Sequence, residues 1–516
     1  MRQFVCVLAL SVPVLLLSAC GGGDSDSGGM LGTGPVRGTL IQSPPARVAS
    51  LSATQVQAAI ATGDLAQTLL QLAATPKCGI DVHYLQYNTV GGVNEATTAS
   101  GAMMIPTGID AACRGARPIV LYAHGTTADR TYNIANFATT HDIEGVLLAA
   151  VFAAQGYIVV APNYAGYDSS TLGYHPYLNA DQSSKEMIDV LSAARSALPT
   201  TFAPTITDSG KLFITGYSQG GHVAMAAHRA LQAAGKTVTA SAPMSGPYAL
   251  AAFGDAVFYG EVNLGAPLLS VLLITSYQHA YGNIYTNTTD VFEPQYASGI
   301  DSLLPSTTPT STLYSQGKLP ATQLFSSTPP DPVYASITPP TTPANFAPLF
   351  ALGFGTSNLI TNAFRLAYLN DAQMNPDGAW PTTTTGLPAA APAHPARKAF
   401  KQNDLRNWAP TAPMLLCAGD QDPTVFYLNT QIMQGYWAMT APTAPVTVLD
   451  VDSTVGSGDP YASLKNGFAA AKLVIAANAV AKGATDAGAS AVLQGYHGTL
   501  VPPFCLAAAK SFFDAH

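Results

Sequence analysis

Stretches of continuous apolar residues alternate along this chain with stretches that are apolar only at helical spacing. Residues 118–122 (PIVLY) and 157–161 (YIVVA) are uninterrupted apolar runs, each long enough for one strand. Strands without polar alternation are typical of parallel sheets whose two faces are both covered. Residues 143–154 and 183–198 carry apolar side chains at the spacing of one helix face. This alternation predicts an α/β fold.

The alternation of strands and helices continues towards the C-terminus, whereas the N-terminal region has a different pattern. Further strands are predicted at 211–215, 237–241, 413–417 and 445–449, and further helices at 219–232, 463–482 and 503–513. Near the start, residues 51–72 have the apolar spacing of one or two helices. Residues 82–85 and 99–105 alternate on either side of Gly91-Gly92, which predicts a β-hairpin ahead of the parallel strands.

The alternation of strands and helices stops between about residues 246 and 410. Helical patterns at 267–280 and 346–373 stand on either side of a segment rich in Pro, Thr and Ser at 303–343. Structureless loops of this length are uncommon in compact domains, so we expect an inserted cap over one end of the sheet. A flexible linker is the alternative for residues 303–343.

The first residues have the pattern of an export signal. Met1-Arg2-Gln3 precedes the apolar run Phe4–Leu17, which is too short for a stable membrane span. Leu17-Ser18-Ala19-Cys20 resembles the lipobox of bacterial lipoproteins, which implies cleavage before Cys20 and lipid attachment to its thiol. Because no acidic residue follows Cys20 directly, the resemblance favours the outer membrane. An ordinary signal peptide that releases a secreted protein is the alternative.

These patterns divide the chain into five segments. We expect a lipoprotein signal at 1–19, a flexible tether at 20–50, the first part of an α/β core at 51–245, a cap or lid at 246–410, and the second part of the core at 411–516. The tether begins with glycines and polar residues that cannot bury a core. A chain of this length exceeds the usual size of one core, which fits one large domain with an insertion.

The charge and composition of the chain indicate which kinds of molecule are poor candidates for a partner. Charged residues make up 10% of the chain and apolar residues 48%. Removal of the signal takes away Arg2 alone among the charged residues, so 21 basic residues stand against 30 acidic ones and the net charge is −9. This acidic balance argues against nucleic acid as a partner.

Four cysteines remain once Cys6 and Cys20 are assigned to the signal and the lipid anchor: Cys78, Cys113, Cys417 and Cys505. An even number in an exported protein predicts two disulfides, and three pairings are possible. We favour Cys78 with Cys113, because they bracket the predicted hairpin, and Cys417 with Cys505, because each lies near a candidate catalytic loop described next.

A serine stands on a glycine-rich turn between a predicted strand and a predicted helix. Gly216-Tyr217-Ser218-Gln219-Gly220-Gly221 directly follows the apolar run 211–215. The pattern G-x-S-x-G in this position predicts a nucleophile elbow, a strained turn that holds the serine Oγ out at the end of the sheet. Ser218 is therefore the candidate nucleophile.

A serine hydroxyl needs a histidine base, and the histidine needs a carboxylate to orient it. After strand 413–417, Gly419-Asp420-Gln421-Asp422-Pro423-Thr424-Val425 resembles the G-x-x-D-x-x-V acid loop of α/β hydrolases and places the acid at Asp422. Asp420 is the first alternative, and Asp450, Asp452 and Asp459 are further ones. His497, in a glycine-flanked loop before the last helix, is the candidate base. We expect a short strand at 491–493 to deliver it.

Two backbone donors are expected to stabilise the oxyanion of an acyl-transfer reaction. One is the N–H of Gln219, directly after the nucleophile. The other should come from the loop Ala123-His124-Gly125-Thr126-Thr127 after the first parallel strand, with Thr126 as the donor and Thr127 as the alternative. His124 and His222 precede or adjoin the nucleophile, so we expect both to be structural.

Together these motifs resemble the secretory lipase family, which comprises α/β hydrolases of fungal lipase A type and their bacterial relatives. The resemblance rests on residues 122–126, 161–167 and 175–178 together with the elbow, the Asp422 loop and His497, and it extends over most of the chain. It implies an α/β-hydrolase fold, a mostly parallel sheet flanked by helices, with a large inserted lid.

The leading hypothesis is a serine hydrolase that cleaves carboxylic esters, a lipase or esterase, at a bacterial outer membrane or in the periplasm. It requires no cofactor and no metal, and its partners are a small-molecule or lipid ester and the membrane that holds its anchor. The alternative is an exopeptidase of prolyl-oligopeptidase-like type with the same triad. A binding protein that has kept the fold without activity is disfavoured, because each triad residue type is present.

Overall fold

The computed structural model describes residues 35–61, 66–137, 143–201 and 205–516. The predicted signal and most of the predicted tether, including Cys20, lie outside these residues. Within them, no helix is both long and apolar enough to cross a membrane.

The described residues form a nine-stranded sheet whose order is β1-β2-β3-β5-β4-β6-β7-β10-β11. The strands are β1 (Ala46–Leu51), β2 (Gly79–Val90), β3 (Ala96–Thr107), β4 (Gly115–Ala123), β5 (Ile158–Pro162), β6 (Ile206–Tyr217), β7 (Ala240–Met244), β10 (Met414–Ala418) and β11 (Val446–Asp450). From β5 to β11 all neighbours pair in parallel, whereas β1, β2 and β3 pair antiparallel and join the sheet at β5. The predicted hairpin and α/β class are thus confirmed, and β1 is a strand that the apolar pattern did not reveal.

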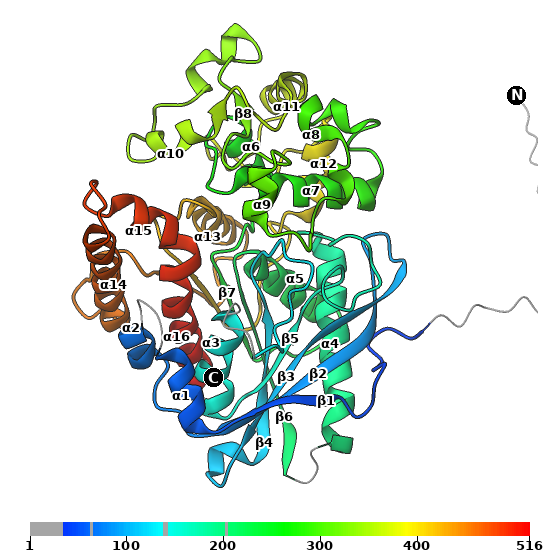
Figure 1. The fold of residues 1–516 in the computed structure, drawn as a ribbon, viewed down its shortest axis with the longest axis vertical. Coiled ribbons are helices and arrows are strands. Elements are labelled where there is room, and N and C mark those ends of the chain that lie inside the picture. The colour runs from blue at the N-terminus through cyan, green and yellow to red at the C-terminus, as the bar shows by residue number, and fades with distance from the viewer. Residues whose placement is uncertain (1–34, 62–65, 138–142, 202–204) are drawn as a thin grey trace, which may run out of the picture. The chain divides into compact units, whose positions relative to one another are not determined.

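Helices cover both faces of the sheet, as the alternation along β4 shows. Val120 and Tyr122 pack in one cluster with residues of α3 (Ile143–Val151) and α16 (Val501–Asp514). Ile119 and Leu121 point to the opposite face and pack with α4 (Ala180–Thr201) and α5 (Gln219–Ala233). A strand that is apolar on both sides is buried between two helical layers, which is why its sequence shows no polar alternation. Figure 1 shows these layers.

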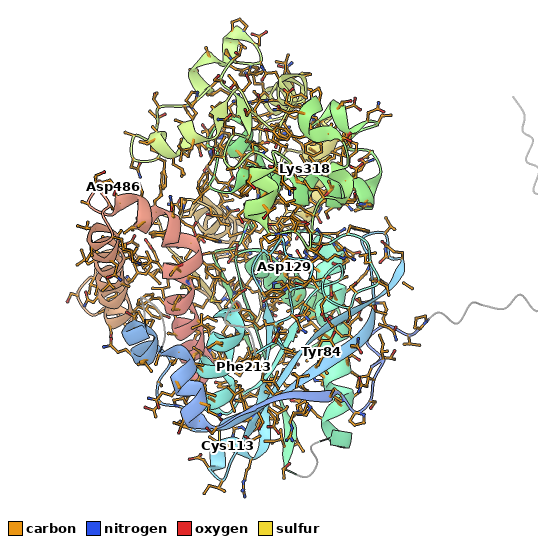
Figure 2. All side chains as sticks on the ribbon, in the orientation of Figure 1. Tyr84, Cys113, Asp129, Phe213, Lys318 and Asp486 are labelled. Atoms are coloured by element: carbon orange, nitrogen blue, oxygen red, sulfur yellow. A yellow bond between two sulfur atoms is a disulfide. The ribbon has the colours of Figure 1, made fainter. Side chains whose placement is uncertain are left out.

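Near the N-terminus, the predicted leading helices are α1 (Ala53–Ile60) and α2 (Ala66–Leu72). The helix α1 begins with a capping box in which Ser52 and Gln55 satisfy each other's backbone N–H groups. The disulfide Cys78–Cys113 joins the start of β2 to the turn after β3, as favoured from the sequence. In Figure 2, Cys113 lies at the end of the core away from Lys318.

The chain between β7 and β10, which we call the inserted segment (residues 246–410), lies outside the nine-stranded sheet, in which β7 and β10 are direct neighbours. Its elements are α6 (Leu250–Phe258), α7 (Ala266–Tyr281), α8 (Pro294–Ala297), α9 (Thr310–Ser315), β8 (Phe325–Ser326), α10 (Ala347–Leu352), β9 (Phe354–Gly355), α11 (Asn362–Met374) and α12 (Pro395–Asn403). Most of these elements share one apolar cluster, which also includes Ala128, Tyr177 and Leu178 of the core. Leu349 and Phe350 of α10 pack instead in a second cluster with Phe426. They group together at one end of the sheet in Figure 1.

The prediction of one helix over 346–373 was wrong. The chain leaves α10 at Gly353, and β9 pairs with β8 before α11 begins. A Cβ at Gly353 would lie 2.4 Å from the Val262 side chain, so this position needs the smallest residue where two parts of the segment meet. Apolar spacing over this range therefore belongs to two short helices and a turn.

The last part of the core contains α13 (Leu428–Thr440), α14 (Ala462–Ala481) and α15 (Ala489–Gly495). The expected strand at 491–493 was wrong, because these residues lie within α15. A five-residue π-helical turn, Tyr496–Leu500, then joins α15 to α16. The disulfide Cys417–Cys505 ties β10 to α16, as favoured from the sequence.

Candidate active site

The nucleophile elbow has the geometry that its sequence predicts. Ser218 follows β6 with φ 60° and ψ −121°, and a positive φ of this kind costs free energy in a non-glycine residue. A Cβ at Gly216 would lie 2.3 Å from the Gly220 carbonyl oxygen, and one at Gly220 would lie 1.9 Å from that of Ala123. Glycine is therefore the residue that lets the strand, the turn and α5 approach this closely.

His497 lies within hydrogen-bond reach of both Ser218 and Asp422. The His497 Nε2 atom is 2.8 Å from the Ser218 Oγ, and its Nδ1 atom is 2.6 Å from the Asp422 Oδ2. An imidazole with its proton on Nδ1 donates to the carboxylate and accepts from the serine hydroxyl. This is the arrangement in which a histidine withdraws a proton from a serine.

The Asp422 carboxylate is fully buried and is fixed by its own loop. Its Oδ1 atom accepts the N–H groups of Thr424 and Val425 at 2.9 and 3.0 Å, which leaves Oδ2 for His497. These bonds compensate for the lost hydration of a buried charge. They also fix the carboxylate in the orientation that the imidazole requires.

The alternative acids have other contacts. The N–H of Asp420 donates to the Asp450 carboxylate, Asp452 pairs with Lys472, and Asp459 pairs with Lys465. Burial raises the pKa of Asp450 to about 6. Among these carboxylates, Asp422 is the one in contact with the His497 ring.

The two expected oxyanion donors face the same cavity as Ser218. Gln219 is the first residue of α5, so its N–H has no partner within the helix. Thr126 lies on the loop after β4, and both residues line the cavity beside Ser218 and His497. Among the described residues, neither N–H donates a hydrogen bond to another residue. Both are thus open to a ligand oxygen.

Glu144, at the start of α3, holds the loop that carries Thr126. Both carboxylate oxygens are 3.2 Å from the N–H of Gly125, and Oε1 accepts the Tyr122 hydroxyl at 2.7 Å. The loop is held from its other side by three tyrosine hydroxyls: Tyr164 donates to the His124 carbonyl at 3.0 Å, Tyr167 donates to the Thr127 carbonyl at 2.7 Å, and Tyr177 lies 2.9 Å from the Thr126 hydroxyl. This network fixes the loop before any substrate binds.

A buried histidine fixes the Gln219 side chain. The Gln219 amide nitrogen lies 2.7 Å from the His175 Nε2, and the His175 Nδ1 lies 3.0 Å from the Ala165 carbonyl oxygen. Burial lowers the pKa of His175 to about 3, so the ring is neutral at physiological pH. A neutral ring with its proton on Nδ1 donates to Ala165 and accepts from Gln219, which satisfies both contacts.

The two histidines expected to be structural stand apart from the triad. His124 lies between the carbonyls of Gly125 and Asn163, and His222 contacts the Asn403 carbonyl at 2.9 Å. Burial lowers the pKa of each to about 4. Both side chains are therefore neutral and have one N–H each, so His124 donates to only one of its two neighbouring carbonyls.

The cavity above the triad has a volume of about 810 Å³ and extends between the core and the inserted segment. Its walls are largely apolar, with leucines from α6, α7 and the loop before α7: Leu250, Leu264, Leu268, Leu269 and Leu273. Glu144 and Gln494 are among the polar residues that line it. In the described part of the chain, no group of three or more His, Cys, Asp or Glu side chains is arranged to hold a metal ion.

Comparison with known proteins agrees with this site. Residues 147–265, which include the elbow, match the prolyl oligopeptidase family. The ligand-bound rice cell wall degrading esterase LipA from Xanthomonas oryzae is 28% identical, with a TM-score of 0.62 over 84% of this chain and 95% of that chain. No curated protein matches the sequence.

Two further solved structures are more distantly similar. A protein from Legionella pneumophila is 19% identical with a TM-score of 0.62, over 92% of this chain and 97% of that chain, which bears on the fold alone. Candida antarctica lipase A in its closed state is 13% identical with a TM-score of 0.46, over 80% and 76% of the two chains, which is too distant to bear on either fold or function.

The mostly parallel sheet, its flanking helices and these similarities define an α/β-hydrolase fold. These similarities support a serine hydrolase of the α/β-hydrolase type. Its two disulfides are compatible with export.

Several residues around the site were missed in the sequence. Tyr217 and Tyr496 each directly precede a candidate catalytic residue, so position alone was a signal for them. His175 and Tyr177 lie in a motif that carried the family resemblance without a role of their own. Glu144 had no local signal, because a glutamate at the start of a helix is common for reasons of helix stability.

Proposed function

We propose that this protein is a serine hydrolase that cleaves carboxylic esters through an acyl-enzyme intermediate. The observation that carries the proposal is the pair of contacts from His497 to Ser218 and Asp422, directly beneath a cavity open to substrate. Hydrolysis then needs no group beyond the protein's own residues and water.

The proposed reaction runs in two steps. Ser218 Oγ bonds to the ester carbonyl carbon as His497 Nε2 takes its proton, and Asp422 stabilises the imidazolium. The N–H groups of Gln219 and Thr126 hold the negative oxygen, each worth on the order of 3 kcal/mol in such sites. His497 then protonates the leaving alcohol. A water molecule, deprotonated by His497, releases the acid and restores Ser218.

The walls of the cavity support an ester with an apolar acyl or alcohol part. Leucines and Phe253 of the inserted segment form much of its surface, and burial of each CH₂ group of a ligand is worth about 0.8 kcal/mol. We therefore propose that the inserted segment acts as the lid of the site and that turnover rises with acyl length until the cavity is full.

One observation favours an exopeptidase as a second candidate. Glu144 lines the cavity, and a carboxylate there is the group that would bind the amino terminus of a peptide. The match to the prolyl oligopeptidase family points the same way. However, Glu144 already accepts hydrogen bonds from Gly125 and Tyr122, so we assign it to the protein and place the ester first.

A substrate panel separates the two candidates. p-Nitrophenyl esters of rising acyl length should be tested beside aminoacyl p-nitroanilides, with Ser218→Ala as the blank. We expect ester turnover that Ser218→Ala abolishes and little release of nitroaniline. Nitroaniline release without ester turnover would favour the peptidase, and ester turnover that survives in Ser218→Ala would contradict the mechanism.

We also propose that Cys20 carries a lipid anchor, on the basis of the lipobox-like sequence alone. The full chain expressed in a bacterium should partition into the detergent phase of Triton X-114. Cys20→Ser should move it to the aqueous phase, whereas Cys6→Ser within the signal should not. Aqueous partition of the unaltered chain would instead favour the secreted alternative.

A further inference from the structure

Two tyrosines connect the three catalytic loops, and each directly precedes a proposed catalytic residue. Tyr217 precedes Ser218, and its hydroxyl donates to the backbone carbonyl of His497 at 2.6 Å. Tyr496 precedes His497, and its hydroxyl accepts the N–H of Gln421, the neighbour of Asp422, at 3.2 Å. Tyr217, at the end of β6, thus links Ser218 to the turn that carries His497. Tyr496, in that turn, links His497 to the loop that carries Asp422.

The carbonyl of His497 needs a partner from outside its own helix. His497 lies in the π-helical turn Tyr496–Leu500, in which the N–H of Val501 donates to the Tyr496 carbonyl. The next residue is Pro502, which has no N–H to offer. Tyr217 supplies the missing donor, because its hydroxyl reaches the carbonyl that the proline leaves without one.

The acid loop has a glycine at the point where the Tyr496 ring arrives. A Cβ on Gly419 would lie 2.5 Å from the Tyr496 Oη and 2.8 Å from its Cε1. Gly419 is the first residue of the G-x-x-D-x-x-V motif that identified Asp422. Its backbone gives no other reason for glycine, since its φ lies outside the left-handed range. Close approach of Tyr496 therefore accounts for the glycine.

Both hydroxyls are set up to remain protonated. Tyr217 and Tyr496 are 4% and 2% exposed. Burial raises the pKa of both, and the neighbouring Asp452 carboxylate, which accepts the Tyr496 hydroxyl at 2.8 Å, raises the pKa of Tyr496 further. Each hydroxyl is therefore protonated, and able to donate, at neutral pH.

We infer that Tyr217 and Tyr496 are positioning residues that set the distances among Ser218, His497 and Asp422. Neither needs to touch substrate for this role: Tyr217 acts through the His497 backbone, and Tyr496 acts through the acid loop. The inference rests on the proposed serine mechanism and is independent of which acyl compound the protein cleaves.

The test measures the reactivity of Ser218 directly. Wild type, Tyr217→Phe, Tyr496→Phe and Gly419→Ala are treated with a fluorophosphonate, and the rate constant of labelling is determined well below each variant's unfolding midpoint. A displacement of about 1 Å in a catalytic group costs on the order of 100-fold, so we expect labelling to slow by roughly 10- to 100-fold. For a p-nitrophenyl ester, kcat should fall by the same factor with KM little changed.

Two control variants separate positioning from a general loss of packing. Tyr296→Phe also removes a buried hydroxyl that donates to a backbone carbonyl, that of Ser357, within the inserted segment. Gly435→Ala adds a Cβ that meets no atom within 4 Å. Both should label at the wild-type rate.

The outcomes are distinct. Wild-type labelling rates in Tyr217→Phe and Tyr496→Phe would overturn the inference, and so would a loss of rate that disappears when corrected for the folded fraction. Slower labelling of the fully folded variants, at unchanged KM, supports it. If the wild type is labelled at Ser218 but cleaves no ester, the proposed ester function falls while the labelling rates still decide the roles of the tyrosines.

Discussion

The carboxylate of Glu144 holds the N–H of Gly125 with both of its oxygens, each at 3.2 Å. Gly125 directly precedes Thr126, the proposed second oxyanion donor. An acceptor that takes up one N–H of the loop fixes the direction of the next one. A carboxylate with no sequence signal therefore contributes to the geometry of the proposed oxyanion site.

Replacement of Glu144 by alanine should weaken that geometry. The change leaves the Gly125 N–H and the Tyr122 hydroxyl without this acceptor, so the loop loses its fixed orientation. Removal of one oxyanion donor costs about 10²- to 10³-fold in kcat, and we expect roughly 10- to 100-fold here because the donor is displaced rather than deleted.

A matched control is Glu95→Ala. The Glu95 carboxylate also accepts a tyrosine hydroxyl, that of Tyr174, and a backbone N–H, that of Val93, but it lies at the turn between β2 and β3. Its loss should leave kcat within twofold. Equal effects of the two variants on ester turnover would show that Glu144 has no special role.

Asp422→Asn tests which aspartate orients the base. The amide keeps the size of the side chain but cannot hold the imidazole with its proton on Nδ1, and the comparable change in serine proteases costs about 10⁴-fold. We expect a loss of roughly 10³- to 10⁴-fold in kcat for ester hydrolysis. The kcat of Asp420→Asn should stay close to that of the wild type. A large loss of kcat in Asp420→Asn with little loss in Asp422→Asn would assign the acid to Asp420.

Much of the fold and site was readable because each part has a local steric cause. The apolar strands, the glycine-flanked Ser218 and the Asp422 loop all carry their reasons in adjacent residues. The position of His497 has no such local cause. Residues 491–493 are apolar enough for a strand, yet they lie within α15. The π-helical turn after them depends on contacts with Tyr217 from another part of the chain.

The inserted segment was harder to predict for the same reason. The break in the strand and helix alternation predicted the segment, but it could not show that helices there end where distant side chains meet, as at Gly353 against Val262. Arg365 is buried there among carbonyls and aromatic rings, which no pattern of apolar residues reveals.

The two disulfides should differ in their effect on activity. Chain-entropy estimates for bridges that span 35 and 88 residues give about 4 and about 5 kcal/mol of stabilisation, respectively. Cys417 and Cys505 also flank the acid and base loops. The double alanine variant at these positions should lose stability to urea and activity together.

The comparison variant is Cys78→Ala with Cys113→Ala. It should lose stability to urea by a similar amount and keep its kcat within twofold at low temperature, because this bridge lies away from the site. A pronounced loss of kcat in this variant alone would contradict the assignment of the two bridges.

Glu186 should make stability depend on pH. Burial raises its pKa to about 7 in the folded protein, against about 4.5 when exposed. Between these values the folded state binds the proton that the unfolded state releases, so this residue's contribution to stability falls as pH rises from about 4.5 to 7. At 1.36 kcal/mol per pKa unit, the change amounts to about 3 kcal/mol.

Glu186→Gln removes this titration. The free energy of unfolding of wild type and variant is measured by urea denaturation at several pH values. The value of the variant minus that of the wild type should rise by about 2 to 3 kcal/mol between pH 5 and pH 7.5. The absolute stability of the variant also reflects the contacts of Gln182 and Tyr87 with this side chain, so the change with pH is the relevant quantity. A difference that does not vary with pH would contradict the raised pKa.

The acyl-enzyme itself gives the most direct test of the central claim. Wild type is mixed with a p-nitrophenyl ester, quenched in acid during the burst of nitrophenol release, and digested for peptide mass spectrometry. We predict one acyl group on the peptide that contains Ser218, located on that serine, and none in Ser218→Ala. An acyl group on another residue, or ester turnover with no covalent adduct during a measured burst, would contradict Ser218 as the nucleophile.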